Sequence, residues 1–153
     1  GDIMTEQDTY FMQLALEEAA RAFDADEVPI GAVVVSPHGT LAGTGYNQPI
    51  STNDPTAHAE IVALRDAASF SKNYRLSGFT LYVTLEPCIM CFGAMIQARI
   101  GRLVYGAPDT RTGLLRKEPL FDQLNLNHTV TVEGPFMEEA CSRLLNQFFQ
   151  LRR

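Results

Sequence analysis

Thr84-Leu85-Glu86-Pro87-Cys88-Ile89-Met90-Cys91 is the stretch that decides the fold. Its two cysteines are three residues apart and directly follow a proline, which is well tolerated at the first position of a helix. The spacing predicts that Pro87 opens a helix and that both thiols lie on one side of its first turn. The apolar run from Phe79 to Leu85 predicts a strand just before it. The cysteines are therefore expected where a strand passes into a helix.

A histidine and a glutamate earlier in the chain complete the pattern. His58-Ala59-Glu60 falls in the first turn of a helix predicted from about Ala57 to Ser69. A Cys2His set supplies three protein ligands and leaves one tetrahedral position open for water, whereas a structural zinc site would have four protein ligands. Nitrogen and sulfur ligands favour zinc. The sequence therefore predicts a catalytic zinc site formed by His58, Cys88 and Cys91.

The glutamate has a different expected role. Glu60 follows His58 by two residues, so on a helix it points about 200° away and is a poor fourth ligand. It can still face a bound water, accept its proton and pass the proton to a leaving amine. Attack of activated water on an amidine-like carbon, with loss of ammonia, is hydrolytic deamination. The pattern H-x-E with P-C-x-x-C also matches the known signature of zinc nucleobase deaminases.

The remaining segments predict a single layered domain. A helix is expected over Thr5 to Asp24, where Thr5-x-x-Asp8 resembles a capping box. The β-branched run Ile30 to Val35 predicts a strand buried on both faces. The other expected elements are a strand over Thr40–Tyr46, a loop over Asn47–Pro55, strands over Arg102–Tyr105 and Val130–Glu133, an irregular segment over Ala107–Pro119 and a helix over Met137–Leu151. This order predicts an α/β fold of three α/β/α layers around a central mixed sheet of about five strands.

Composition narrows the class of protein. A chain of 153 residues with 46% hydrophobic and 20% charged residues is expected to form one globular domain, here residues 4–153, with residues 1–3 as extra residues before a natural start at Met4. No signal peptide or membrane span is expected. Three cysteines, two of them in C-x-x-C, indicate a thiolate-bound metal in a reducing, cytoplasmic setting. The net charge of −6 disfavours general nucleic-acid binding but leaves room for a local basic rim.

The chain as a whole resembles bacterial tRNA-specific adenosine deaminases, the TadA family of the cytidine and deoxycytidylate deaminase superfamily. Outside the zinc motif, blocks at 54–60 and 73–76 narrow the resemblance from the superfamily to the tRNA enzymes. The matching blocks are residues 28–32, 45–47, 54–60, 73–76, 81–88, 90–91, 93–96, 99–102, 148–149 and 152–153. The resemblance implies a cytidine-deaminase-like fold and deamination of adenosine to inosine at the wobble position of a tRNA anticodon.

The resemblance also implies roles for particular residues. His58, Cys88 and Cys91 would hold one Zn²⁺ per subunit, and Glu60 would move the proton. Asn47 and the backbone of Ala59 would hold a flipped adenine, and Phe149 would lie along the anticodon loop. The partners would be the tRNA and a second copy of the chain in a homodimer, with no membrane. Departures from the family pattern are Phe92, Leu114–Pro119 and the absence of a basic tail after Arg153.

Several alternatives remain open from the residues alone. A turn-capping role is the alternative for Asn47, and at least one of Phe148 and Phe149 is expected in the core. Cys141 is expected to be a core cysteine. Seven basic residues of the second half form either a phosphate-binding rim or ordinary solvated charge: Arg99, Arg102, Arg111, Arg116, Lys117, Arg152 and Arg153. The same zinc site also suits an enzyme for a free base or nucleoside such as guanine or cytosine, or a catalytically silent RNA-binding subunit, although such a subunit would be expected to lack Glu60.

Overall fold

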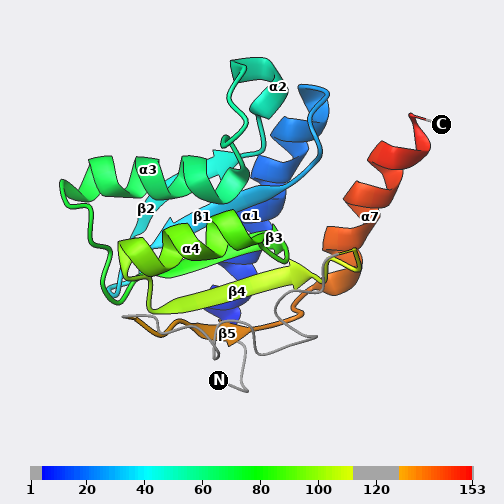
Figure 1. Cartoon of the computed structure of the whole chain (residues 1–153). Coiled ribbons are helices and arrows are strands. Elements are labelled where there is room, and N and C mark those ends of the chain that lie inside the picture. The colour runs from blue at the N-terminus through cyan, green and yellow to red at the C-terminus, as the bar shows by residue number, and fades with distance from the viewer. Residues whose placement is uncertain (1–4, 112–127, 153) are drawn as a thin grey trace.

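A five-stranded sheet lies between two layers of helices (Figure 1). The computed structural model describes residues 5–111 and 128–152. The elements are α1 (Glu6–Asp24), β1 (Gly31–Val35), β2 (Leu41–Tyr46), α2 (Pro49–Thr52), α3 (Ala59–Ser71), β3 (Thr80–Leu85), α4 (Ile89–Ala98), β4 (Arg102–Ala107), β5 (Thr131–Glu133) and α7 (Glu138–Gln150). The prediction of an α/β/α fold with a five-stranded mixed sheet is confirmed.

The strand order explains why the sheet is mixed. The order is β2-β1-β3-β4-β5; β1 pairs antiparallel with β2 and β3, and β3, β4 and β5 are parallel. All five residues of β1 are buried, as its continuous apolar run predicts. One face packs against α3 and α4 around Leu81 and Met95, and the other packs against α1 around Met12 and Val104. Within the described residues, no helix is long and apolar enough to cross a membrane.

Two glycines of β2, which have no side chain, allow α3 to lie unusually close to the edge of the sheet. A Cβ atom built on Gly45 of β2 would lie 2.5 Å from the Ala59 carbonyl oxygen, and one built on Gly43 would lie 2.5 Å from that of Ala63. Any larger residue at either position would collide with the helix backbone. The first turn of α3, which carries Glu60, is therefore seated directly on β2.

Three predicted boundaries are wrong in ways that matter for the site. Helix α4 begins at Ile89 and Cys88 is its N-cap, so Pro87 precedes the helix and does not open it. Helix α3 begins at Ala59 with His58 as N-cap in extended conformation, one to two residues later than predicted. The expected loop over Asn47–Pro55 contains the short helix α2. The part of the predicted irregular segment beyond residue 111, including Leu114–Pro119, lies outside the described residues.

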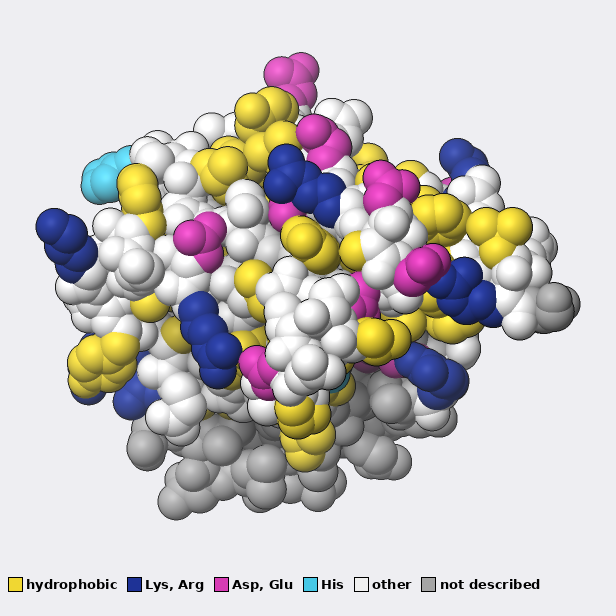
Figure 2. Space-filling model, turned by 90° about the horizontal axis from the view of Figure 1, so that it is seen from above, with side chains coloured by type: hydrophobic (Ala, Val, Ile, Leu, Met, Phe, Trp, Pro, Cys, Tyr) yellow, Lys and Arg dark blue, Asp and Glu magenta, His cyan; other side chains and the backbone are white. Residues whose placement is uncertain are grey.

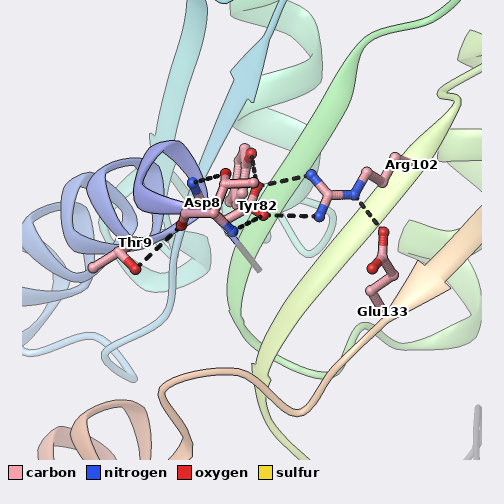
Figure 3. Close-up of polar contacts among 6 residues, drawn as sticks. Asp8, Thr9, Tyr82, Arg102 and Glu133 are labelled. Atoms are coloured by element: carbon pink, nitrogen blue, oxygen red, sulfur yellow. Dashed lines mark hydrogen bonds and ion pairs between the residues drawn. The ribbon is translucent and has the colours of Figure 1, made fainter. Parts of the chain in front are cut away.

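The predicted capping box at the start of α1 is confirmed and belongs to a larger polar cluster. Thr5 and Asp8 exchange hydrogen bonds at the N-terminus of α1. The buried Asp8 carboxylate also accepts hydrogen bonds from the Tyr82 hydroxyl (2.6 Å) and from Arg102 Nη1 (2.8 Å) (Figure 3). Arg102 Nε donates to Glu133 at 2.5 Å. The cluster thus joins α1 to β3, β4 and β5.

The charge state of Asp8 follows from these contacts. Burial alone raises the pKa of Asp8, but hydrogen bonds from Arg102 and Tyr82 outweigh it, so the pKa lies well below the ordinary aspartate range. A carboxyl whose folded pKa is lowered stabilises the protein fully above its unfolded pKa of about 4. That stabilisation is lost as the pH falls through the folded pKa.

Asp8→Asn is expected to lower the free energy of unfolding by about 3 kcal/mol at pH 7, because it removes the buried carboxylate that pairs with the half-buried guanidinium of Arg102. Urea denaturation at pH 7 and at pH 3 measures the effect, which should shrink at the lower pH. Asp24→Asn on the exposed end of the same helix is the control and should change stability by less than about 0.5 kcal/mol. Equal losses in the two variants would contradict this account.

Candidate metal centre and active site

Two helix N-termini bring the three expected metal ligands together. His58 is the N-cap of α3, Cys88 is the N-cap of α4, and Cys91 lies in the first turn of α4. Both helices cover the same face of the sheet (Figure 1). One ligand atom from each of these residues lies within 4.8 Å of the others. The fold thus joins groups that are thirty residues apart in sequence.

The distances between the ligand atoms suit zinc. His58 Nδ1 lies 3.6 Å from Cys88 Sγ and 3.5 Å from Cys91 Sγ. Tetrahedral coordination with ordinary Zn–N and Zn–S bonds requires a nitrogen-to-sulfur separation of about 3.6 Å. The donor set of two sulfurs and one imidazole nitrogen also suits this metal. Both nitrogen-to-sulfur distances therefore fit coordination of one zinc ion by these three side chains.

Proton sharing between the two thiols prepares them for a metal. A hydrogen bond from Cys91 lowers the pKa of Cys88 to about 4, assisted by His58. The hydrogen bond with Cys88, together with burial, raises the pKa of Cys91. The pair thus holds one proton between a thiolate and a thiol. Because zinc binds thiolates, metal binding must release that proton.

Glu60 is a buried carboxyl directly beside the ligands. It is the second residue of α3 and 4% exposed. Burial raises the pKa of Glu60 to about 7, with a further increase from the negative charge of Cys88 and an opposing effect of the Cys91 hydrogen bond. A carboxyl with a pKa close to neutrality can both accept and return a proton. Glu60 is therefore suited to proton transfer at this site.

The other residues expected to contact the substrate are Asn47 and Ala59, which are buried, and Phe149, which is exposed. Asn47, 8% exposed, follows β2 and donates its backbone N–H to the Ile30 carbonyl at 3.0 Å. Ala59 is fully buried at the start of α3, next to His58. Phe149 lies on α7 and is 45% exposed, whereas its neighbour Phe148 is 4% exposed and packs in the core. Thus one member of the aromatic pair is a core residue, as predicted.

Phe149 borders a cavity of about 490 Å³ between α7 and the loop after β4, where Asp109 and Arg111 also lie. Cys141 is buried at the base of α7, which confirms its assignment to the core. Arg102, for which a phosphate-binding rim and solvated charge were both open, fits neither alternative, because it is half-buried and pairs with Asp8 and Glu133. Arg116, Lys117 and Arg153 lie outside the described residues.

The face of the protein seen from above carries mixed charge. In Figure 2, Lys and Arg side chains (dark blue) are interspersed with Asp and Glu side chains (magenta) and hydrophobic groups across the visible face. Arg111 hydrogen-bonds to Asp109, and Arg152 pairs with Asp26 at 2.8 Å. These pairs reduce the positive field that the individual arginines would otherwise produce.

Sequence reasoning missed two buried carboxylates near the site. Glu86 is 2% exposed and accepts the Asp109 backbone N–H at 2.8 Å, which ties the loop after β4 to the segment that carries Cys88. Glu27 is 1% exposed and accepts hydrogen bonds from α2. The sequence did contain a signal for these buried carboxylates: each is a glutamate near one end of an apolar strand, where a purely solvent-exposed charge is unexpected.

Comparison with known proteins defines the class. Residues 5–107 match the family described as the cytidine and deoxycytidylate deaminase zinc-binding region. This match spans α1 to β4 and includes both halves of the candidate metal site. The chain is thus a zinc-binding deaminase-fold protein, and its cofactor is zinc.

More similar relatives define the family within this class. The chain is 47% identical over 152 residues to a tRNA-specific adenosine deaminase of Haemophilus influenzae, covering 99% of this chain and 88% of the relative. A protein of the same description from Aquifex aeolicus is 41% identical, covering 94% of this chain and 95% of the relative. The chain belongs to the family of tRNA-specific adenosine deaminases.

Solved structures agree with this assignment. One, from a study of A-to-I editing by tRNA:A34 deaminases at the wobble position of transfer RNA, is 43% identical with a TM-score of 0.84, covering 89% of this chain and 99% of that one. A guanine deaminase from Nitrosomonas europaea is 26% identical with a TM-score of 0.80, covering 95% of this chain and 85% of that one. The fold therefore accommodates more than one purine substrate.

Proposed function

We propose that the protein hydrolyses adenosine to inosine and ammonia at the wobble position of a tRNA anticodon. The observation that carries the proposal is the grouping of His58, Cys88 and Cys91 at zinc-binding distances beside the buried carboxyl of Glu60. The substrate is proposed from relatives at up to 47% identity that are described as tRNA-specific adenosine deaminases.

The proposed roles divide between the metal and the protein. Zinc, when bound by His58, Cys88 and Cys91, supplies a Lewis acid that activates water. Glu60 accepts a proton from the attacking water and delivers it to the departing amino group, which leaves as ammonia. Because Glu60 is nearly free of solvent, the proton is retained within the site between these steps.

The adenine must leave the base stack to reach this site. Asn47 and the Ala59 backbone are proposed to hold it, since they flank His58 at the end of β2 and the start of α3. Phe149 offers an exposed ring beside a cavity, where a neighbouring base of the anticodon loop can stack.

A homodimer is proposed as the working form. A groove of about 410 Å³ between α3 and α4 has mainly apolar walls, including Ile61, Leu64 and Ala94. Tyr74 at its rim is 72% exposed. A second copy of the chain, in the cytoplasm where tRNA is processed, would cover this groove. Analytical ultracentrifugation at micromolar concentration would show a monomer if this proposal is wrong.

The function is tested by incubating the zinc-loaded protein with a transcribed tRNA that has adenosine at the wobble position, alongside free adenosine, cytidine and guanine. We expect inosine in the tRNA only, detected by nuclease digestion and chromatography. The similarity to a guanine deaminase makes free guanine the informative competitor. Turnover of guanine with an unchanged tRNA would overturn the substrate and keep the zinc chemistry.

A further inference from the structure

A buried carboxylate that the proposed chemistry does not use lies between α1 and β1. Glu27 is 1% exposed, yet none of the ion pairs found within residues 5–111 and 128–152 involves it. Burying a carboxylate without a cation is costly unless hydrogen bonds replace its water. The partners of Glu27 therefore identify what the residue is there to hold.

Within the part of the chain that the structure describes, the side-chain hydrogen bonds of Glu27 go to α2. Glu27 Oε2 accepts the Ser51 backbone N–H at 2.6 Å and the Ser51 hydroxyl at 2.7 Å. Glu27 Oε1 accepts the Ile50 backbone N–H at 3.4 Å. Hydrogen bonds to a charged acceptor are the stronger kind. The carboxylate thus fastens the first turn of α2 to the segment between α1 and β1.

Helix α2 belongs to the segment that links two proposed site residues. The segment runs from Asn47 to His58. A hydrogen bond from the Gln48 N–H to the Ala57 carbonyl (3.0 Å) joins its two ends. Helix α2 itself has little packing to hold it, since Ile50 is 75% exposed and no residue of α2 is buried. Glu27 therefore holds the α2 part of the segment from outside, while an exposed ion pair between Arg65 and Asp54 (3.8 Å) links the later part of the segment to α3.

We propose that Glu27 is a positioning residue: by holding α2, it sets Asn47 relative to His58 and so orients the adenine for attack. This inference depends on the proposed function for the identity of the substrate. The fastening of α2 by Glu27 does not depend on it. Reaction rates respond strongly to orientation, and a displacement of about 1 Å can cost about 100-fold.

The test compares Glu27→Gln with Glu17→Gln, a matched change at an exposed position of α1. Glutamine keeps the volume but removes the charge and one acceptor. Amide hydrogen exchange, followed by NMR, should be at least about tenfold faster at Ile50 and Ser51 in Glu27→Gln and unchanged at core Val104, because only the local attachment is weakened. The control should match the parent protein throughout.

Kinetics separate positioning from general stability. For zinc-loaded, folded Glu27→Gln we expect kcat to fall about tenfold or more with little change in KM, and Glu27→Asp to recover part of the loss. If the parent protein proves to act on a free base, the same comparison is made with that base. Unchanged exchange at Ile50 and Ser51, or unchanged kcat despite faster exchange, would overturn the proposal.

A second variant covers the case in which Glu27→Gln does not fold. Ser51→Ala removes only the hydroxyl donor on an exposed residue. It should raise the exchange rate at Ser51 and lower kcat in the same direction, by less than Glu27→Gln. An Ser51→Ala protein with parental exchange and parental kcat would also contradict the role of Glu27.

Discussion

Glu60→Gln should abolish deamination while the protein stays folded and zinc-loaded. The substitution keeps the size and hydrogen-bonding shape of the side chain but removes its ability to accept a proton. Because positioned acid–base groups contribute about 100- to 10,000-fold, we expect kcat to fall by about 1,000-fold or more. Measurement of inosine formation under single-turnover conditions, with zinc content determined by atomic absorption, checks this result.

Stability distinguishes lost chemistry from lost structure. Burial raises the pKa of Glu60, which means that the ionised carboxylate is an unfavourable group at this position. Glutamine removes that cost, so the melting temperature of Glu60→Gln should equal or exceed that of the parent. Asp66→Asn, at an exposed position of the same helix, should leave turnover intact. Retained turnover in Glu60→Gln would eliminate Glu60 as the proton carrier.

Cys88→Ala should prevent tight zinc binding and destabilise the region where α3 meets α4. The variant leaves one thiol and one imidazole, which are too few protein ligands for a stable site. Metal content after dialysis should fall from about one zinc per chain to nearly none, and deamination should disappear with it. Metal binding contributes directly to folding free energy, so the melting temperature should drop as well.

Cys141→Ala provides the matched control for this loss. Cys141 is buried, like Cys91, but it lies on α7 against Gly106 of β4 and belongs to the core on the other face of the sheet. Removing its sulfur should leave metal content unchanged and cost only the stability expected for a small core cavity. If Cys88→Ala retained full zinc occupancy under the same dialysis, the assignment of Cys88 as a ligand would be wrong.

The sequence predicted most of the fold because its periodic segments are long and uninterrupted. The apolar run of β1 and the amphipathic pattern of α1 each have one compatible structure, and both are confirmed. The metal ligands could also be predicted from the sequence, since C-x-x-C after a proline can be recognised without knowledge of the fold. The side chains of His58, Cys88 and Cys91 are close together as predicted.

The features that escaped prediction depend on contacts between distant segments. The role of Arg102 is set by Asp8, which is 94 residues away, so local composition suggested a surface residue. Helix α2 has only four residues and is held by Glu27 from another part of the chain. The start of α4 moved past Pro87 because Cys88 serves as its N-cap. Tertiary contacts, and not local propensity, decide the first two of these.

The glycines of β2 limit how such a site can diversify. Gly43 and Gly45 leave no room for a side chain between the strand and α3. The helix that carries the reactive carboxyl is therefore held at a fixed distance from β2. Surface residues around the metal site, by contrast, can change without moving α3. Divergence of substrate preference within this architecture is therefore expected to accumulate at the periphery, while the spacing between strand and helix is inherited unchanged.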